Sequence, residues 1–188
     1  HLDHLQAHRM QALLDRAPSL KPGDEVPPAW HWLYFHEAAR TSDLGMDGHT
    51  RLGVFMPPFP LPRRMWAGES IQWLKPLRLG SAAQRTTRIG SIAQKQGRTG
   101  PLIFTTIEHV VSQGGDLCIQ ENQNIVYRAA ANESVSTSPE LASTESDFVQ
   151  DWKFGSTELF RSSALTFNGH KIHYDPDYTR DVEGYPGL

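Results

Sequence analysis

The stretch from residue 69 to residue 129 limits the possible folds most strongly. It consists of short segments rich in β-branched and aromatic residues, separated by glycine-containing turns such as KQGRTG and SQGGD, a pattern typical of strands joined by tight turns. Short connections make neighbouring strands antiparallel. The sequence therefore predicts an antiparallel sheet whose four strands lie near residues 69–74, 84–94, 101–112 and 117–128.

The fourth predicted strand has one face that is only partly apolar. Alternate residues of this strand, the odd-numbered ones, are apolar except for Glu121 and Gln123. The apolar members of this set are Leu117, Ile119, Ile125 and Tyr127. We therefore expect one end of this face to contact water or to serve a function.

Two helices are expected before the sheet. Apolar residues recur at roughly helical spacing over residues 2–14, and Pro18 disfavours continuation of this amphipathic helix. Residues 29–45 carry aromatic side chains on more than one side, so a helix here is expected to be buried. The curved sheet would wrap around that helix, and the expected fold is α+β of the hot-dog type. Residues 48–66, with four prolines, are predicted to form a structured loop.

Composition excludes several classes of protein. The chain has 188 residues, enough for one domain or two small ones. A net charge of -3 gives no basic field, so we expect neither nucleic acid nor an anionic membrane as partner. Cys118, the single cysteine, excludes an internal disulfide and favours a cytoplasmic location. No apolar run suits a membrane helix or a signal peptide, and the first residue is not Met, so we expect residues to precede it.

Residues 164–175, ALTFNGHKIHYD, hold the residues most suited to chemistry. One interpretation is a metal site, because His170 and His173 lie three residues apart with Asp175 and Asp177 nearby. A second is a plain structural turn, since Asn168 precedes a glycine. The spacing alone does not decide between them.

A third interpretation is an acid/base site. His173 lies in an alternating IHYD run, where its neighbours can anchor the backbone while the imidazole faces a cleft. The structural alternative is a core histidine bonded to a carbonyl. Asn168 has either a direct role or only a turn role, and both stay open.

The motif TFNGHKIHYD followed by EGYPG resembles that of MaoC-like, type-2 enoyl-CoA hydratases and 3-hydroxyacyl-thioester dehydratases, with the pattern Ser-Gly-Asp-x-Asn-Pro-Leu-His-x-Asp. The pattern's histidine falls on His173, its last aspartate on Asp175 and its catalytic aspartate on Asn168. LGMDGHTRLGVFMPPFPLPRRMWAG and ENQNIVYRAA are similar to the subgroup that includes mesaconyl-CoA and itaconyl-CoA hydratases. The resemblance therefore covers nearly the whole chain.

The resemblance implies a double hot-dog organisation. Residues 1–129 would form the N-terminal hot-dog domain, 130–157 a linker and 158–188 the start of the second hot-dog with the catalytic motif. The family pattern continues past EGYPGL into a second central helix and sheet, which this sequence does not contain.

The resemblance also implies an activity and its residues. We expect hydration of a short enoyl-CoA such as itaconyl-CoA or mesaconyl-CoA without a cofactor or metal, with His173 as the acid/base and Asn168 orienting water. The candidate substrate-binding residues are Arg63, Arg64, Arg161, His170 and Tyr174. The alternatives are a 3-hydroxyacyl-carrier-protein dehydratase of fatty-acid elongation and a non-catalytic subunit that binds acyl thioesters. The oligomeric state stays open, a homo-oligomer included.

Overall fold

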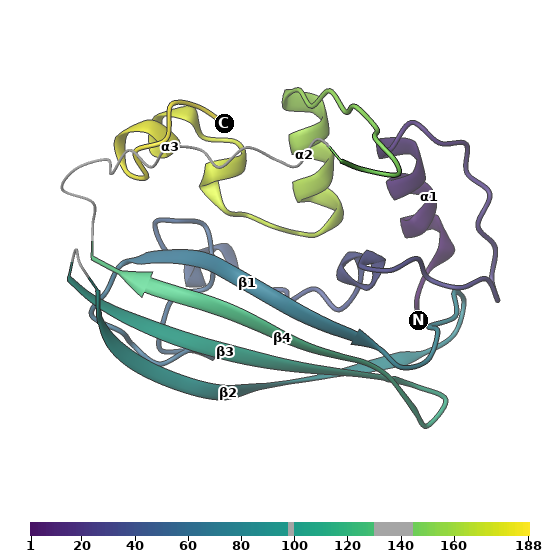
Figure 1. Ribbon diagram of the computed structural model, residues 1–188, viewed down its shortest axis with the longest axis horizontal. Helices are drawn as coiled ribbons and strands as arrows, with labels where there is room; N and C mark the ends of the chain where they lie inside the picture. Colours follow the sequence, from purple (N-terminus) through teal and green to yellow (C-terminus); the bar gives the residue numbers. More distant parts are fainter. Residues whose placement is uncertain (98–99, 130–144) are drawn as a thin grey trace.

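One four-stranded antiparallel sheet organises the structure. The computed structural model describes residues 1–97, 100–129 and 145–188, and its strands lie in the order β1-β4-β3-β2 (Figure 1). The four predicted strands and their antiparallel pairing are confirmed. The observed bounds are β1 Arg63–Trp73, β2 Ala83–Gly97, β3 Gly100–Gln113 and β4 Asp116–Arg128.

Strand β3 shows why the sheet has one buried face. Every second residue from Ile103 to Val111 is buried, and alternate residues of a strand point to the same face. The β3–β4 hairpin turns at Gly114 and Gly115, whose φ angles of 61° and 88° suit glycine. The helices all lie over this buried face, on one side of the sheet (Figure 1).

The predicted N-terminal helix is confirmed as α1, His4–Leu13. Asp3 caps it, because its side chain accepts a hydrogen bond of 3.0 Å from the backbone N–H of Leu5. Its buried residues are Ala7 and Gln11, whereas Leu5 is 48% exposed. The helix is therefore less regularly amphipathic than the sequence pattern indicated.

The predicted long helix over residues 29–45 is wrong. Only two short 3-10 helices form there, η1 Trp30–Leu33 and η2 Thr41–Asp43. Ala29 and Phe35, which flank η1, have φ angles of 67° and 61° that no α-helix accommodates. The segment is nevertheless partly buried, since His31 is 2% exposed, Leu33 is 4% exposed and Tyr34 is 8% exposed.

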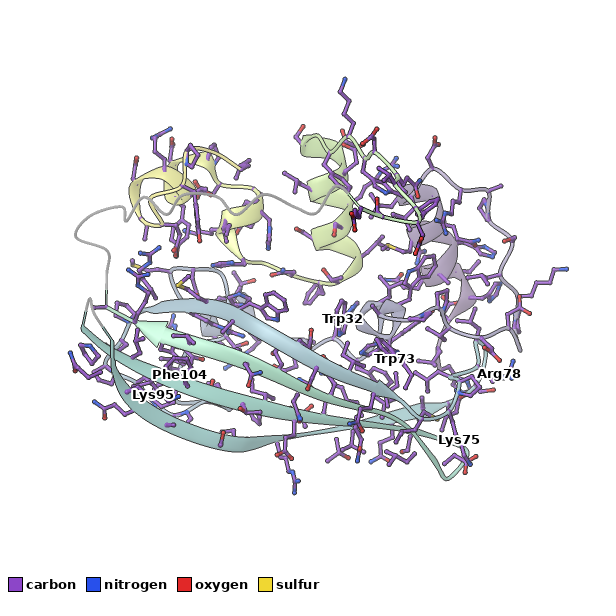
Figure 2. The ribbon with its side chains drawn as sticks, viewed as in Figure 1. Trp32, Trp73, Lys75, Arg78, Lys95 and Phe104 are labelled. Atoms are coloured by element: carbon purple, nitrogen blue, oxygen red, sulfur yellow. The ribbon has the colours of Figure 1, made fainter. Side chains whose placement is uncertain are left out.

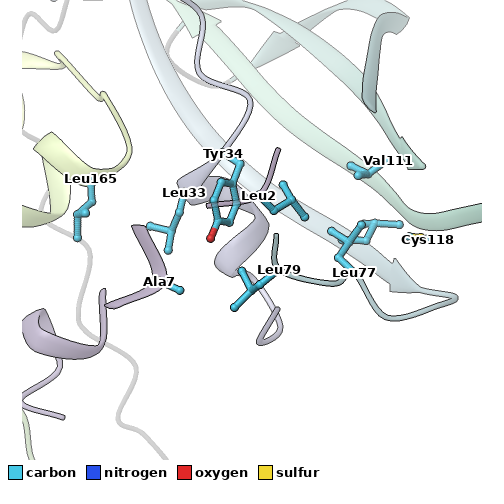
Figure 3. Close-up of a cluster of buried hydrophobic side chains, with 10 residues drawn as sticks. Leu2, Ala7, Leu33, Tyr34, Leu77, Leu79, Val111, Cys118 and Leu165 are labelled. Atoms are coloured by element: carbon cyan, nitrogen blue, oxygen red, sulfur yellow. The ribbon is translucent and has the colours of Figure 1, made fainter. Parts of the chain in front are cut away.

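Two apolar clusters form the core between the sheet and the segments above it. The first joins α1, η1 and the end of the sheet near Cys118, which is 2% exposed (Figure 3). Its buried members are Leu2, Ala7, Leu33, Tyr34, Leu77, Leu79, Val111, Cys118, Ile119 and Leu165. The second contains Met56, Leu61, Ile103, Ile107, Ile125 and Tyr127.

The proline-rich loop is structured, as predicted, because Met56 and Leu61 belong to the second cluster. It ends earlier than predicted, since β1 already begins at Arg63. A β-bulge between Trp66 and Gly68 lies in this early part of β1, and such an irregularity hides a strand from a search for strict alternation.

The C-terminal part of the described chain forms α2 Ser156–Leu165, η3 Lys171–His173 and α3 Pro176–Asp181. Residues 130–144 of the predicted linker lie outside the described residues, and α2 begins two residues before the predicted domain boundary at 158. Gln6 joins α1 to α2 by donating a hydrogen bond of 2.9 Å from Nε2 to the carbonyl of Leu165. No helix in the described ranges is long and apolar enough to cross a membrane.

Candidate active site

The predicted motif forms a turn between α2 and η3. Phe167, and not Asn168, takes the left-handed conformation that ends α2, with φ 51°. The Oδ1 atom of Asn168 accepts a hydrogen bond of 3.0 Å from the backbone N–H of His170, which is an Asx turn. The amide of Asn168 therefore has a structural role on its oxygen side, while its nitrogen remains a donor for another group.

His173 lies at the end of η3 and is half-buried. Burial lowers the pKa of its imidazole, so the ring is uncharged at neutral pH and is able to accept a proton. Its ring lies edge-on to that of His170, with the centroids 5.9 Å apart. The motif thus places the imidazoles of His170 and His173 side by side.

A loop from the N-terminal half docks on this motif. The backbone N–H of Lys171 donates a hydrogen bond of 2.9 Å to the carbonyl of Asp47. The backbones of Gly48 and Gly169 are so close that a Cβ at Gly48 would lie 1.9 Å from the Gly169 carbonyl oxygen. Only glycine permits this approach.

His49, which sequence reasoning missed, is brought into the site by this docking. Its ring stacks on that of His170 with centroids 4.7 Å apart. Burial, followed by the positive charge of Arg64 and the nearby imidazoles of His170 and His173, lowers the pKa of His49 to about 3. The proline-rich loop has no periodic pattern that would place His49 in a site. The only local signal is the polar sequence DGHT, in which His49 lies.

Three potential metal ligands meet at this point, but they are not the predicted set. One ligand atom each of Asp47, His49 and His170 lies within 4.8 Å of the others. Tetrahedral zinc ligands about 2.1 Å from the ion would lie about 3.4 Å apart. Asp175 instead caps α3 by accepting a hydrogen bond of 2.9 Å from the backbone N–H of Tyr178.

The two candidate arginines at the start of β1 have different surroundings. Arg63 is 8% exposed and forms an ion pair with Glu183, with 2.7 Å between Nη2 and Oε2, so its guanidinium connects β1 to the segment after α3. Arg64 is half-buried and lies close enough to His49, His170 and Tyr127 to affect their pKa values. Of the two arginines, Arg64 is therefore the one that lies near His49 and His170.

Arg161 lies apart from this point, whereas Tyr174 directly follows His173 at the end of η3. Arg161 lines a groove of about 530 Å³ between α1 and α2, together with Arg9, Phe160 and other residues of both helices. Tyr174 is 53% exposed. The structure thus brings Arg64, His170 and His173 together, but places Arg161 in a separate groove.

A second polar cluster lies inside the sheet face, where the sequence placed the interruption at Glu121. Glu121 is 4% exposed and accepts hydrogen bonds from His31 Nε2 at 2.8 Å and Trp32 Nε1 at 3.0 Å, and Trp32 lies on the helix side of the sheet (Figure 2). Burial, then a hydrogen bond to Glu121, raises the pKa of Glu69 to about 8. Burial disfavours ionisation of Glu121, but the hydrogen bonds from His31, Glu69 and Trp32 outweigh it and lower its pKa.

Comparisons with known proteins identify relatives of this chain. The mesaconyl-C(4)-CoA hydratase of Chloroflexus aurantiacus is 46% identical over 164 residues, which cover 87% of this chain and 59% of that protein. The mitochondrial hydroxyacyl-thioester dehydratase type 2 of Schizosaccharomyces pombe is 26% identical over 192 residues, covering 87% and 62%. The chain thus spans about three fifths of the length of these two relatives.

Solved structures show the same fold at low sequence identity. HtdX of Mycobacterium tuberculosis has a TM-score of 0.63 and 16% identity, with all of this chain and 66% of that one covered. A MaoC-like dehydratase has a TM-score of 0.59 and 11% identity, covering 100% and 68%. The α+β hot-dog fold expected from the sequence is therefore confirmed.

The family profile described as "Hydroxyacyl-thioester dehydratase type 2" matches residues 29–188, which include the docking loop, the sheet and the histidine motif. The chain therefore belongs to the hydroxyacyl-thioester dehydratase type 2 family.

Proposed function

We propose that the full-length protein is a hydro-lyase that adds water across the double bond of a short enoyl-CoA thioester. Itaconyl-CoA and mesaconyl-CoA are the proposed substrates. The observation that carries this proposal is the 46% identity over 87% of the chain to a mesaconyl-C(4)-CoA hydratase. The uncharged, half-buried imidazole of His173 supplies the acid/base group that such a reaction needs.

His173 acts first as the base. In mesaconyl-C4-CoA, whose double bond is conjugated with the thioester, it removes a proton from water while the oxygen attacks the β-carbon, and the electron pair of the double bond moves towards the thioester carbonyl. The α-carbon then takes the proton from the imidazolium, which returns His173 to its neutral form. One water molecule supplies both atoms added to the double bond.

Asn168 positions the water in this proposal. An amide accepts no proton at neutral pH, so it cannot be the base. Its Oδ1 is already bound to the backbone of His170, and the Nδ2 group is therefore the donor that holds the water oxygen. This division explains how one side chain serves both the turn and the reaction.

The groove between α1 and α2 is proposed to bind the nucleotide part of CoA. Arg9 and Arg161 provide two guanidinium groups, which suit phosphate. Phe160, 69% exposed, provides an aromatic face beside them. The groove adjoins α2, the helix that leads directly into the histidine motif.

A substrate panel tests the proposal with purified full-length protein. We expect mesaconyl-CoA or itaconyl-CoA to be hydrated with a higher kcat/KM than long-chain enoyl thioesters. Higher activity on long-chain or carrier-bound substrates would instead support the elongation dehydratase; the Schizosaccharomyces pombe relative is named a hydroxyacyl-thioester dehydratase. Binding without turnover of any thioester would support the non-catalytic subunit.

The His173→Ala variant tests the acid/base role. General acid/base groups contribute about 10²–10⁴-fold to rate, so kcat should fall by that factor while thioester binding is retained. His4→Ala, at the start of α1, is the matched control and should keep full activity. Wild-type turnover in a folded His173→Ala protein would contradict the mechanism.

A further inference from the structure

Arg64 and Tyr127 form a pair on the buried side of the sheet that the mechanism above does not use. They are opposite each other in the β1–β4 register, so their side chains leave the same face, with Cβ atoms about 5 Å apart. Arg64 is half-buried, and within the described residues its guanidinium has no hydrogen bond or ion pair. The neighbouring Arg63, in contrast, is fully occupied by Glu183.

Tyr127 contributes a hydroxyl group that also lacks a partner. Its side chain is 1% exposed, and its hydroxyl is buried with no hydrogen-bond partner among the described residues. Phe59 packs against the ring with centroids 4.8 Å apart, which fixes its position. Leaving a buried hydroxyl unpaired is costly, so this group is arranged to meet an oxygen or nitrogen atom from outside the chain.

None of the neighbouring groups among the described residues pairs with Arg64. The rings of His49 and His170 stack on each other with their centroids 4.7 Å apart. Asp47 is the carboxylate near this space, and its Oδ1 accepts a hydrogen bond of 3.0 Å from the backbone N–H of His49. It forms no salt bridge with Arg64 in the described structure, so the guanidinium remains available to a ligand.

We propose that Arg64 and Tyr127 bind a free carboxylate on the acyl group of the substrate, which makes carboxylated enoyl thioesters the preferred substrate class. The guanidinium pairs with the carboxylate, and the Tyr127 hydroxyl donates to one of its oxygens. Arg64 and Tyr127 are specificity-determining residues in this proposal. The inference rests on the proposed hydratase function and adds to it the reason for selecting one class of acyl group.

A carboxylate fits this position better than a CoA phosphate. Arg64 lies near His49 and His170, and the ring of His170 lies 5.9 Å, centroid to centroid, from that of His173, where the acyl group must react. The phosphates are at the opposite end of the CoA thioester, and the groove with Arg9 and Arg161 is available to them. One guanidinium and one buried hydroxyl also match a planar group with two oxygens.

The test compares two substrates that differ only at this position. Mesaconyl-C4-CoA carries a carboxylate on the β-carbon, where 3-methylcrotonyl-CoA carries a methyl group. For full-length Arg64→Met, kcat/KM on mesaconyl-C4-CoA should fall at least ~10²-fold, whereas kcat/KM on 3-methylcrotonyl-CoA should change less than about threefold. Tyr127→Phe should lower kcat/KM on mesaconyl-C4-CoA about tenfold, again without affecting the uncharged substrate.

Arg88→Met is the matched control, because Arg88 is an exposed arginine on β2 that pairs with Glu108 away from the site. It should leave both substrates unaffected. Should Arg64→Met not fold, Arg64→Lys tests the same point and should retain a reduced preference for mesaconyl-C4-CoA. An equal loss on both substrates, or no loss on either, would overturn the carboxylate assignment. A wild-type protein that hydrates neither substrate would instead refute the proposed function itself.

Discussion

The carboxyl groups of Glu69 and Glu121 share a hydrogen bond inside the sheet face. Only one of the two needs to ionise, because His31 and Trp32 hold the charge on Glu121. Glu69 therefore keeps its proton at neutral pH. An unfolded Glu69 would lose that proton near its ordinary pKa of 4.5.

This difference gives stability a pH dependence of definite sign. Between pH 4.5 and 8 the folded protein binds one more proton at Glu69 than the unfolded protein, so this contribution to the free energy of unfolding falls as pH rises. Glu69→Gln keeps a donor for Glu121 and removes the titration. We expect Glu69→Gln to be more stable than wild type by about 1 kcal/mol at pH 8 to 9, discounted for partial solvation.

Urea denaturation across the pH range measures this difference. The control is Glu108→Gln, which removes a carboxylate paired with Arg88 on the sheet surface and should change the pH profile little. A stability difference between wild type and Glu69→Gln that stays constant from pH 5 to 9 would show that Glu69 does not titrate in this window.

Asn168 permits a second test at the same scale. In Asn168→Asp the new carboxylate keeps the bond to the His170 backbone but loses the Nδ2 donor, so activity should be retained only in part. A negative charge near His173 favours its protonated form, and the acid limb of kcat should therefore move to higher pH by about one unit. pH-rate profiles of both proteins provide the measurement.

The control for the new charge is Asn124→Asp, where the side chain bonds Thr106 within the sheet. Its acid limb should coincide with that of wild type. An unshifted limb in Asn168→Asp would place Asn168 too far from His173 to take part in the reaction.

Among the elements, the loop around Gly48 determines how the two halves of the described chain meet. Its φ of 87° and its contact with Gly169 both require glycine. Gly53, in the same loop, has a similar φ of 94° but no atom within 4 Å of an added Cβ. Alanine substitutions at Gly48 and at Gly53 therefore separate two losses of stability, one from backbone strain and one from lost contact between the loop and the motif.

We expect Gly53→Ala to cost about 1–2 kcal/mol, the price of a left-handed alanine. Gly48→Ala should cost at least twice as much and should also lower kcat, because His49 and His170 would lose their contact. Urea midpoints and steady-state rates measure both effects. Equal costs for the two variants would mean that the loop does not dock on the motif in solution.

The strands were predictable from the sequence because alternation in β3 and β4 reflects burial on one face of each strand. The short 3-10 helix η1, which forms in place of the helix expected over residues 29–45, was not predictable. The hydrogen bonds from His31 and Trp32 to Glu121 are contacts with a distant strand that leave no local sequence pattern. Likewise, the motif revealed His173 and Asn168 as candidates, whereas the position of His49 depends on contacts across more than 100 residues that leave no local pattern.

For the molecule as a whole, the trio of Asp47, His49 and His170 permits a test of the expectation that no metal binds. A metal held between the loop and the motif would join two parts of the chain and so stabilise the fold. We expect EDTA to leave both the melting temperature and activity unchanged. Stoichiometric zinc or iron by elemental analysis, lost in His49→Ala, would reverse this expectation.

Cys118 is the one cysteine of the sequence and lies within the first apolar cluster, 2% exposed. A thiol reagent can modify it only when the contacts between α1, η1 and the end of the sheet open. The rate of labelling therefore reports the opening equilibrium of that region without any engineered probe. If α1 and the sheet separate as a unit, a ligand bound at the histidine motif will slow labelling only to the extent that the motif unfolds together with the region around Cys118.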